Sequence, residues 1–180
     1  IGGPPAVAVN LSARQFADPD LVGDVAAILS RTGLPPARLR LEITERVALA
    51  DDAPTTRTLA ALHALGVGLA IDDFGTGYSG LGTLKGSLVD TLKIDRSFVA
   101  GLGGDDRDTA IVRAVLALAG ALGMVTVAEG VETDGQVAAL RSLGCDRGQG
   151  YHFARPMVHA DLARYLRSPS GASPALQRIH

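Results

Sequence analysis

Seven residues whose side chains can bind metal ions or move protons stand at or near the ends of short apolar segments. They are Asn10, Glu42, Asp72, Asp73, Lys93, Asp95 and Glu129. The carboxyl ends of parallel strands in an α/β barrel converge on one face of the fold, and that face carries the active site. Grouped carboxylates repel one another unless cations neutralise them, and oxygen ligands favour hard cations such as Mg²⁺ or Mn²⁺. The pattern therefore predicts a divalent metal centre.

The adjacent pair Asp72 and Asp73 is the most specific part of this pattern. Two adjacent carboxylates leaving a strand can bridge two metal ions, an arrangement that activates water for attack on a phosphodiester. A single aspartate at a strand end is more often a helix cap or a loop acceptor. Lys93 alone would fit a surface lysine, but its place between Leu92 and Ile94 argues against that. The whole series favours a metal site over these structural roles.

The segment Gly75–Gly80 fits the G-x-G-x-x-G pattern of dinucleotide-binding proteins. That pattern requires a preceding strand and a helix immediately after it, with the pyrophosphate at the helix N-terminus. Asp72 and Asp73 directly precede the loop and would repel a pyrophosphate, and Gly82 and Gly86 interrupt the segment that follows. These residues therefore argue against a dinucleotide site.

Strand-like and helix-like segments alternate along the chain, which is typical of α/β folds with parallel strands. About six apolar segments are predicted to be strands: 6–11, 39–44, 67–73, 91–95, 125–129 and 148–153. Helical periodicity predicts helices over residues 20–32, 55–65, 108–122, 134–143 and 160–166. A closed (β/α)₈ barrel needs eight strands and roughly 250 residues. We interpret the fold as a modified TIM barrel lacking its first strands and helix, with an open doubly wound sheet as the alternative.

Composition narrows the class of protein further. Of 180 residues, 47% are hydrophobic, which suits one domain with a large buried core, expected over residues 1–167. Residues 168–180 are rich in Ser, Pro and Gly and are predicted to form a flexible tail. The 17 Lys and Arg residues against 19 Asp and Glu residues argue against binding to DNA or to a membrane surface. A single cysteine excludes a disulfide framework. Because we find no signal peptide or spanning segment, we expect a cytoplasmic location.

Six motifs, in order, carry a resemblance to a known family. They are residues 10–12, 41–45, 71–79, 92–95, 128–132 and 149–151. Together they extend over nearly everything from Ala6 to Leu166, and the chain resembles the EAL-domain cyclic di-GMP phosphodiesterases. The resemblance implies hydrolysis of cyclic di-GMP to linear pGpG in bacterial second-messenger signalling, with two ions of Mg²⁺ or Mn²⁺.

The resemblance also implies which residues would hold the metal ions. Asn10, Glu42 and Asp72 would hold one metal ion, and Asp72 and Asp73 would bridge to a second. Glu129 would either complete the second metal site or act as the general base, and the sequence leaves both roles open. These five residues are the predicted metal ligands.

Four further residues receive roles from the same resemblance. Lys93 would orient and polarise the attacking water, helped by Asp95. Gln149 would hydrogen-bond near that water or the substrate, and Asp95 would also lie at the substrate. Glu45 would anchor the loop at residues 74–80, whose glycines let it change shape.

We expect the Glu-Ala-Leu segment that names the family to be absent, because the chain begins downstream of it. The fragment would then lack one metal-ligating glutamate, so we expect activity of the parent protein rather than of this fragment. The family further suggests a homodimer formed through the region of residues 74–82, with sensor or cyclase domains upstream. The alternative function is a non-catalytic cyclic di-GMP receptor, and the retained Asp, Glu and Lys residues favour catalysis over it.

Overall fold

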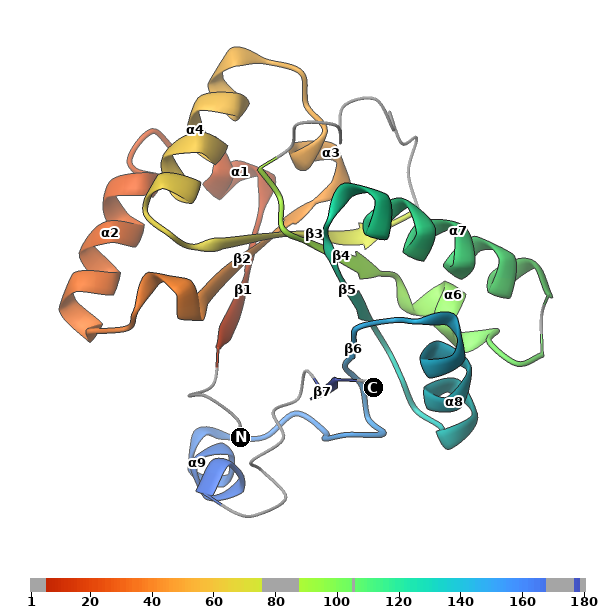
Figure 1. Cartoon of the computed structure of the whole chain (residues 1–180). Coiled ribbons are helices and arrows are strands. Elements are labelled where there is room, and N and C mark those ends of the chain that lie inside the picture. Colours follow the sequence, from red (N-terminus) through yellow and green to blue (C-terminus); the bar gives the residue numbers. More distant parts are fainter. Residues whose placement is uncertain (1–5, 76–87, 105, 168–176, 179–180) are drawn as a thin grey trace. The chain divides into compact units, whose positions relative to one another are not determined.

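The chain divides into two compact units, and the computed structural model describes residues 6–75, 88–104, 106–167 and 177–178. The N-terminal unit comprises residues 6–93 and 122–124. The C-terminal unit comprises residues 94–121 and the described residues from 125 onward. In both units strands are followed by helices (Figure 1), which is the α/β organisation that the sequence predicts.

Parallel strands form the centre of the N-terminal unit: β1 (Val7–Leu11), β2 (Leu39–Thr44) and β3 (Gly68–Phe74). The next strand in the sheet order is β4 (Thr91–Ile94). Ile43, Leu69 and Ile71 are completely buried, as are Leu92 and Ile94 on β4. Strands buried on both faces need almost continuous apolar sequence, and this is why the segments were recognisable as strands.

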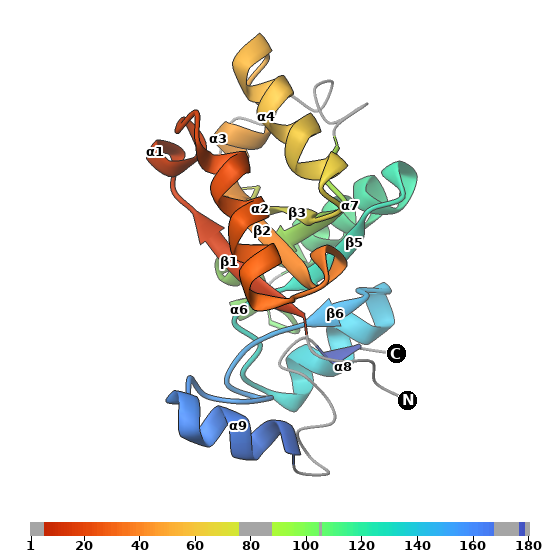
Figure 2. The ribbon, with the colours of Figure 1, turned by 90° about the vertical axis from the view of Figure 1, so that its left-hand side faces the viewer.

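The helical elements of the N-terminal unit are α1 (Ala13–Phe16), α2 (Leu21–Thr32), η1 (Pro36–Arg38), α3 (Glu45–Ala48) and α4 (Ala53–Ala64). Helices α2 and α4 lie side by side along strands β1–β3 (Figures 1 and 2). Gly33 ends α2 in the left-handed conformation, with φ 68°, and Asp52 caps α4 by accepting from the Thr55 N–H at 2.8 Å. Local sequence signals thus set the limits of both helices.

Asp90 fixes the start of β4, the strand that carries Lys93. Its carboxylate accepts from the Leu69 N–H on β3 at 3.0 Å and from Arg40 Nη2 on β2 at 3.2 Å. The Asp90 N–H in turn donates to the Leu69 carbonyl at 3.0 Å. These bonds tie the residue before β4 to β3 and to β2 and so position Lys93 along the sheet.

The C-terminal unit continues the alternation of strands and helices. Its elements are α6 (Arg96–Ala100), α7 (Asp106–Leu122), β5 (Val125–Ala128), α8 (Asp134–Leu143), β6 (Arg147–Gly148), α9 (His159–Arg167) and β7 (Gln177–Arg178). Strand β5 pairs with β6 in parallel, and β6 pairs with β7 in antiparallel orientation. No helix among the described residues is long and apolar enough to cross a membrane.

The predicted elements agree with these bounds to within a few residues, with one exception. The strand predicted over residues 148–153 is wrong, because β6 ends at Gly148 and the chain then turns. Gly150 has φ 155°, and its carbonyl accepts from the N–H groups of Phe153 and Ala154. Of the tail predicted over residues 168–180, only residues 177 and 178 are described, as β7; the rest lies outside the described residues.

Candidate functional site

A buried lysine joins two carboxylates in the N-terminal unit. Lys93 Nζ donates to Glu42 Oε2 at 2.6 Å and to Asp72 Oδ1 at 2.7 Å. The side chains of Lys93 and Glu42 are 5% and 8% exposed, and that of Asp72 is 19% exposed. Charges buried to this degree lose most of their hydration, so each one is stable only with its partners in place.

The register of the parallel strands brings these side chains together. Asn10 on β1 lies directly opposite Glu42 on β2, and Thr44 on β2 lies opposite Asp72 on β3. Paired residues of a parallel ladder point to the same face. With its amide nitrogen turned toward the carboxylates, Asn10 donates to Asp72 Oδ2 at 3.1 Å and to Glu42 Oε2 at 3.2 Å. Four of the predicted site residues therefore form one cluster.

Asp73 follows Asp72 in an unusual backbone conformation. Its φ of 52° lies in the left-handed region, which side-chain-bearing residues rarely adopt and which Asp tolerates better than most. Strain of this kind tends to occur at functional sites. The next turn is held by Glu45, whose buried carboxylate accepts from the Gly75 N–H at 3.1 Å. This bond lies at the start of the loop that Glu45 is predicted to anchor; residues 76–80 of that loop lie outside the described residues.

A second pair of predicted site residues lies in the C-terminal unit. Gln149 Nε2 donates to Glu129 Oε1 at 2.7 Å, and both side chains are half-buried. The Glu129 N–H donates to the Ile94 carbonyl at 3.1 Å, which fixes Glu129 at the end of β5. Main-chain bonds from adjacent segments thus set the position of this carboxylate.

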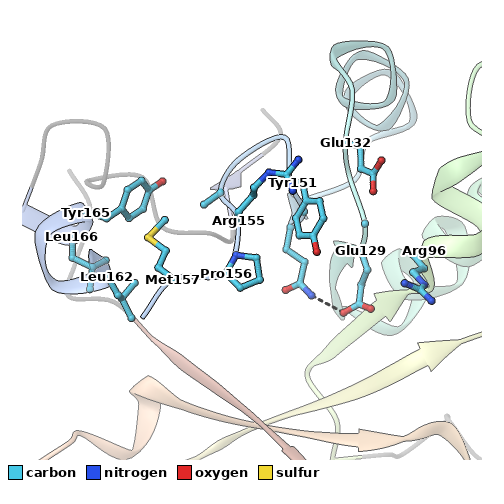
Figure 3. Close-up of a pocket in the computed structure, with 14 residues that line it drawn as sticks. Arg96, Glu129, Glu132, Tyr151, Arg155, Pro156, Met157, Leu162, Tyr165 and Leu166 are labelled. Atoms are coloured by element: carbon cyan, nitrogen blue, oxygen red, sulfur yellow. Dashed lines mark hydrogen bonds between the residues drawn. The ribbon is translucent and has the colours of Figure 1, made fainter. Parts of the chain in front are cut away.

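Glu129 and Gln149 line a cavity of about 530 Å³ in the same unit (Figure 3). Its lining combines charged, aromatic and apolar side chains, and the residues are Arg96, Glu129, Gly130, Glu132, Gln149, Gly150, Tyr151, Ala154, Arg155, Pro156, Met157, Leu162, Tyr165 and Leu166. Figure 3 shows the carboxylate of Glu129 near Tyr151 and Arg96, with Met157, Leu162 and Leu166 gathered toward α9. The guanidinium of Arg155 lies 4.7 Å from the centre of the Tyr151 ring. A cavity with one polar and one apolar end suits a ligand of mixed character.

Asp95 has a structural partner in the same unit. Its carboxylate caps α6 by accepting from the Ser97 N–H at 2.9 Å and also accepts from the Ser97 hydroxyl. This is the helix-cap role that a strand-end aspartate takes most often. Its role beside Lys93 or the substrate stays a prediction.

Sequence reasoning assigned no role to several residues that line the cavity. The charged and aromatic ones are Arg96, Glu132, Tyr151, Arg155 and Tyr165. Glu132 and Tyr151 stand inside motifs that carry the family resemblance, so a signal existed for them. Arg155 carries no motif of its own, and only the turn after β6 brings it over the Tyr151 ring.

The donor set of the N-terminal cluster fits a divalent cation. Glu42 and Asp72 offer carboxylate oxygens, and Asn10 offers an amide oxygen when its amide turns over from the orientation that donates to them; these are the ligands that Mg²⁺ and Mn²⁺ prefer. Two carboxylates against the one ammonium of Lys93 leave an excess negative charge, and Asp73 stands next in the chain. These residues are therefore suited to hold a metal ion of this kind.

Comparison with known proteins identifies the class of domain. A family model described as "EAL domain" matches residues 2–156, so the chain belongs to the EAL domain family. Our expectation that the EAL segment is missing was wrong, because the match begins at residue 2 and extends over most of the chain. Family membership itself was predicted correctly.

Individual relatives narrow the comparison. The chain is 49% identical over 151 residues to the "Bifunctional diguanylate cyclase/cyclic di-GMP phosphodiesterase MucR" of Pseudomonas aeruginosa, over 84% of this chain and 22% of that protein. The structure titled "PaMucR Phosphodiesterase, c-di-GMP complex" matches with a TM-score of 0.83 at 48% identity, over 87% of this chain and 64% of that chain. A manganese and cyclic di-GMP complex of BlrP1 from Klebsiella pneumoniae matches with a TM-score of 0.77 at 37% identity, over 84% of this chain and 39% of that chain.

These matches confirm the predicted fold class, an α/β fold of the TIM-barrel type. The first matching relatives are much longer than this chain, which spans about a fifth of their length.

Proposed function

We propose that this domain is a cyclic di-GMP phosphodiesterase, which hydrolyses the cyclic dinucleotide to linear pGpG in bacterial signalling. The observation that carries the proposal is the cluster in which Lys93 bridges Glu42 and Asp72, with Asn10 beside them. Membership of the EAL family and the cyclic di-GMP phosphodiesterases among its relatives indicate the substrate.

Divalent metal ions are part of this proposal. We propose that Asn10, Glu42 and Asp72 hold one Mg²⁺ or Mn²⁺ ion and that Asp72 and Asp73 reach a second. The BlrP1 complex named above contains manganese, which supports the choice of metal. Such ions act as Lewis acids that stabilise negative charge on a phosphoryl group and favour ionisation of water.

The chain's own residues then have distinct tasks. Lys93, buried between two carboxylates, supplies a fixed positive charge that needs no reorganisation as the reaction proceeds. Glu129, oriented by Gln149, is either a further metal ligand or the group that accepts a proton from the attacking water. The cavity beside Glu129 and Gln149 binds the nucleotide, with Asp95 and Gln149 as substrate contacts.

Incubation of the chain with cyclic di-GMP and Mg²⁺ or Mn²⁺ tests the proposal, with separation of linear pGpG by chromatography. The matched variant is Glu42→Gln, which keeps the size of the side chain and removes its charge. We expect product from the wild-type chain and at least about a hundredfold less from the variant. Binding of cyclic di-GMP without product, in a chain loaded with metal, would instead identify a receptor.

We propose two further properties of the whole protein. The first is fusion to sensor or cyclase domains upstream, which the bifunctional name of MucR and its greater length support. The second is a homodimer that involves residues 74–82, most of which lie outside the described residues. We also propose that the protein is located in the cytoplasm. Analytical ultracentrifugation of the chain with and without cyclic di-GMP tests whether it forms a dimer.

A further inference from the structure

Two turns of the C-terminal unit pass each other at very short range. One follows β5 and contains Val131, and the other follows β6 and contains Gly150. A Cβ atom added to Gly150 would lie 2.2 Å from the carbonyl oxygen and 2.3 Å from the nitrogen of Val131. Contacts under 3.0 Å are essentially never made by real Cβ atoms, and here the opposing atoms are backbone. Only glycine permits this approach.

Main-chain hydrogen bonds hold the two turns together. The Gln149 N–H donates to the Ala128 carbonyl at 2.8 Å, and the Val131 N–H donates to the Gln149 carbonyl at 3.0 Å. The His152 N–H then donates to the Val131 carbonyl at 3.0 Å. These bonds continue the pairing of β5 with β6 beyond the last paired residues, Ala128 and Gly148. The two turns therefore form one rigid connection.

Gly130 makes a second close approach from the other side. Its φ is +65°, and a Cβ atom there would lie 2.6 Å from Cβ of Arg96, the first residue of α6. The neighbouring Glu129 N–H donates to the Ile94 carbonyl at 3.1 Å. Glu129 is thus held between the start of α6 and the turn after β6.

Each of these glycines is the immediate neighbour of a proposed site residue. Gly130 follows Glu129, and Gly150 follows Gln149, and the two side chains meet in the 2.7 Å hydrogen bond drawn in Figure 3. We propose that Gly150 is a positioning residue: its approach to Val131 places the Gln149 amide so that it fixes the orientation of the Glu129 carboxylate. The consequence for catalysis rests on the proposed phosphodiesterase function, whereas the consequence for the hydrogen bond does not.

The test compares Gly150→Ala with Gly144→Ala in the whole chain. Gly144 ends α8 in the same unit with φ +83°, and a Cβ atom there would meet nothing within 4 Å. Both substitutions strain a backbone that favours glycine. Only the first forces two turns apart, so differences between the variants report the close approach rather than strain in general.

Nuclear magnetic resonance of the uniformly ¹⁵N-labelled chain gives a direct readout without substrate. In the wild-type chain and in Gly144→Ala, we expect slow hydrogen exchange for the Val131 and His152 amides and a distinct Gln149 side-chain amide signal. In Gly150→Ala, exchange at both amides becomes fast, and the Gln149 signal moves to the position of an exposed amide. Unchanged signals in a folded Gly150→Ala chain would overturn the proposal.

Kinetics separate positioning from support of the fold. We expect Gly150→Ala to lower kcat about a hundredfold, the cost of a misplaced catalytic group, with little change in KM. Combined with Gln149→Ala, it should lower kcat little further, because both substitutions remove the same hydrogen bond. Fully additive losses in kcat would show that Gly150 acts through the fold alone and would overturn the positioning role.

A Gly150→Ala chain that does not fold is replaced by Gly130→Ala, in which the added Cβ atom would lie 2.6 Å from Cβ of Arg96 and 3.5 Å from its backbone Cα, a less severe clash than the one at Gly150. In Gly130→Ala we expect the same change in the Gln149 side-chain signal, with a smaller loss of kcat. An unchanged Gln149 signal in this variant would contradict the proposal that the packed turns place the Gln149 amide. If the wild-type chain does not hydrolyse cyclic di-GMP, the proposed function fails, and the resonance data alone decide the placement of Gln149.

Discussion

Nζ of Lys93 lies 2.6 Å from Oε2 of Glu42, and both side chains are less than a tenth exposed. The two residues are 51 positions apart in the chain and belong to β4 and β2. With Asp72 on β3 as its second partner, the ammonium offsets part of the negative charge of these two carboxylates. The same contacts that hold this charge for chemistry also make the N-terminal unit depend on it for stability.

Replacement of Lys93 by Ala is therefore expected to destabilise the fold as well as abolish activity. Removing one partner leaves two carboxylates without a cation, and breaking a buried ion pair costs about 3–5 kcal/mol. Because Asp72 is 19% exposed, water reaches it, and we expect the lower end of that range. Urea unfolding measures the change.

The control for Lys93→Ala is Arg31→Ala, at an exposed position in the last turn of α2. This substitution should change the free energy of unfolding by no more than about 0.5 kcal/mol. Equal stabilities of the two variants would contradict the buried charge cluster.

Substitution of Asn10 by Asp tests the metal site without changing the size of the side chain. With its amide nitrogen turned toward the carboxylates, Asn10 donates to both Asp72 and Glu42, so the new carboxylate would replace an attraction with a repulsion. In the presence of a chelator, we expect a loss of about 1 kcal/mol in stability, since Asn10 is exposed and water screens the charge.

Excess Mn²⁺ should restore that stability and raise the melting temperature of Asn10→Asp more than that of the wild-type chain. A ligand that binds only the folded state stabilises it in proportion to RT ln(1 + [L]/Kd), so tighter metal binding appears as a larger shift. Thermal unfolding with and without Mn²⁺ gives both values. An identical metal-induced shift in the two chains would remove Asn10 from the metal site.

The residues of the N-terminal cluster could be predicted, because each stands in or beside a recognisable apolar strand. Glu42 and Asp72 lie within β2 and β3, and Lys93 lies within β4. What the sequence does not contain is the register, which places Asn10 opposite Glu42 and lets Lys93 reach two carboxylates. Register depends on how the apolar faces of two segments far apart in the chain pack together, so one segment alone does not define it.

The turn after β6 shows a different limit of sequence reasoning. The apolar and aromatic residues from Gly148 to Phe153 read as a strand. The close approach of Gly150 to Val131 instead turns the chain, and this contact joins segments 19 residues apart. Short helices such as α3 and α6 were also missed, since one or two turns are too short to show a helical period.

Glu129→Ala is expected to abolish cleavage while binding of cyclic di-GMP remains largely intact. Glu129 is one of 14 residues that line the cavity, so truncating its side chain removes little of the contact surface. As a base or a metal ligand it would act mainly in the transition state, and such a loss appears in kcat rather than in KM. Product formation and calorimetric binding of cyclic di-GMP measure the two effects, and turnover at the wild-type rate would exclude Glu129 from the mechanism.

The single cysteine supplies a prediction about pH. Burial raises the pKa of the Cys145 thiol above its usual value of 9.0, against the opposing effect of a hydrogen bond with Thr126. The folded chain thus holds the neutral thiol, whereas the unfolded chain ionises at lower pH. Stability from this group is full below pH 9 and declines as the pH rises above it, because ionisation then favours the unfolded state.

Two measurements check the state of Cys145. Alkylation by iodoacetamide at pH 8 should be slow in the folded chain and fast in urea. The thiolate is the form that reacts, and Cys145 is only 1% exposed in the folded chain. Between pH 8 and pH 10, Cys145→Ala should lose less stability than the wild-type chain, because alanine has no proton to release. Rapid alkylation of the folded chain, or parallel pH profiles for the two chains, would show that the thiol is not held neutral by burial.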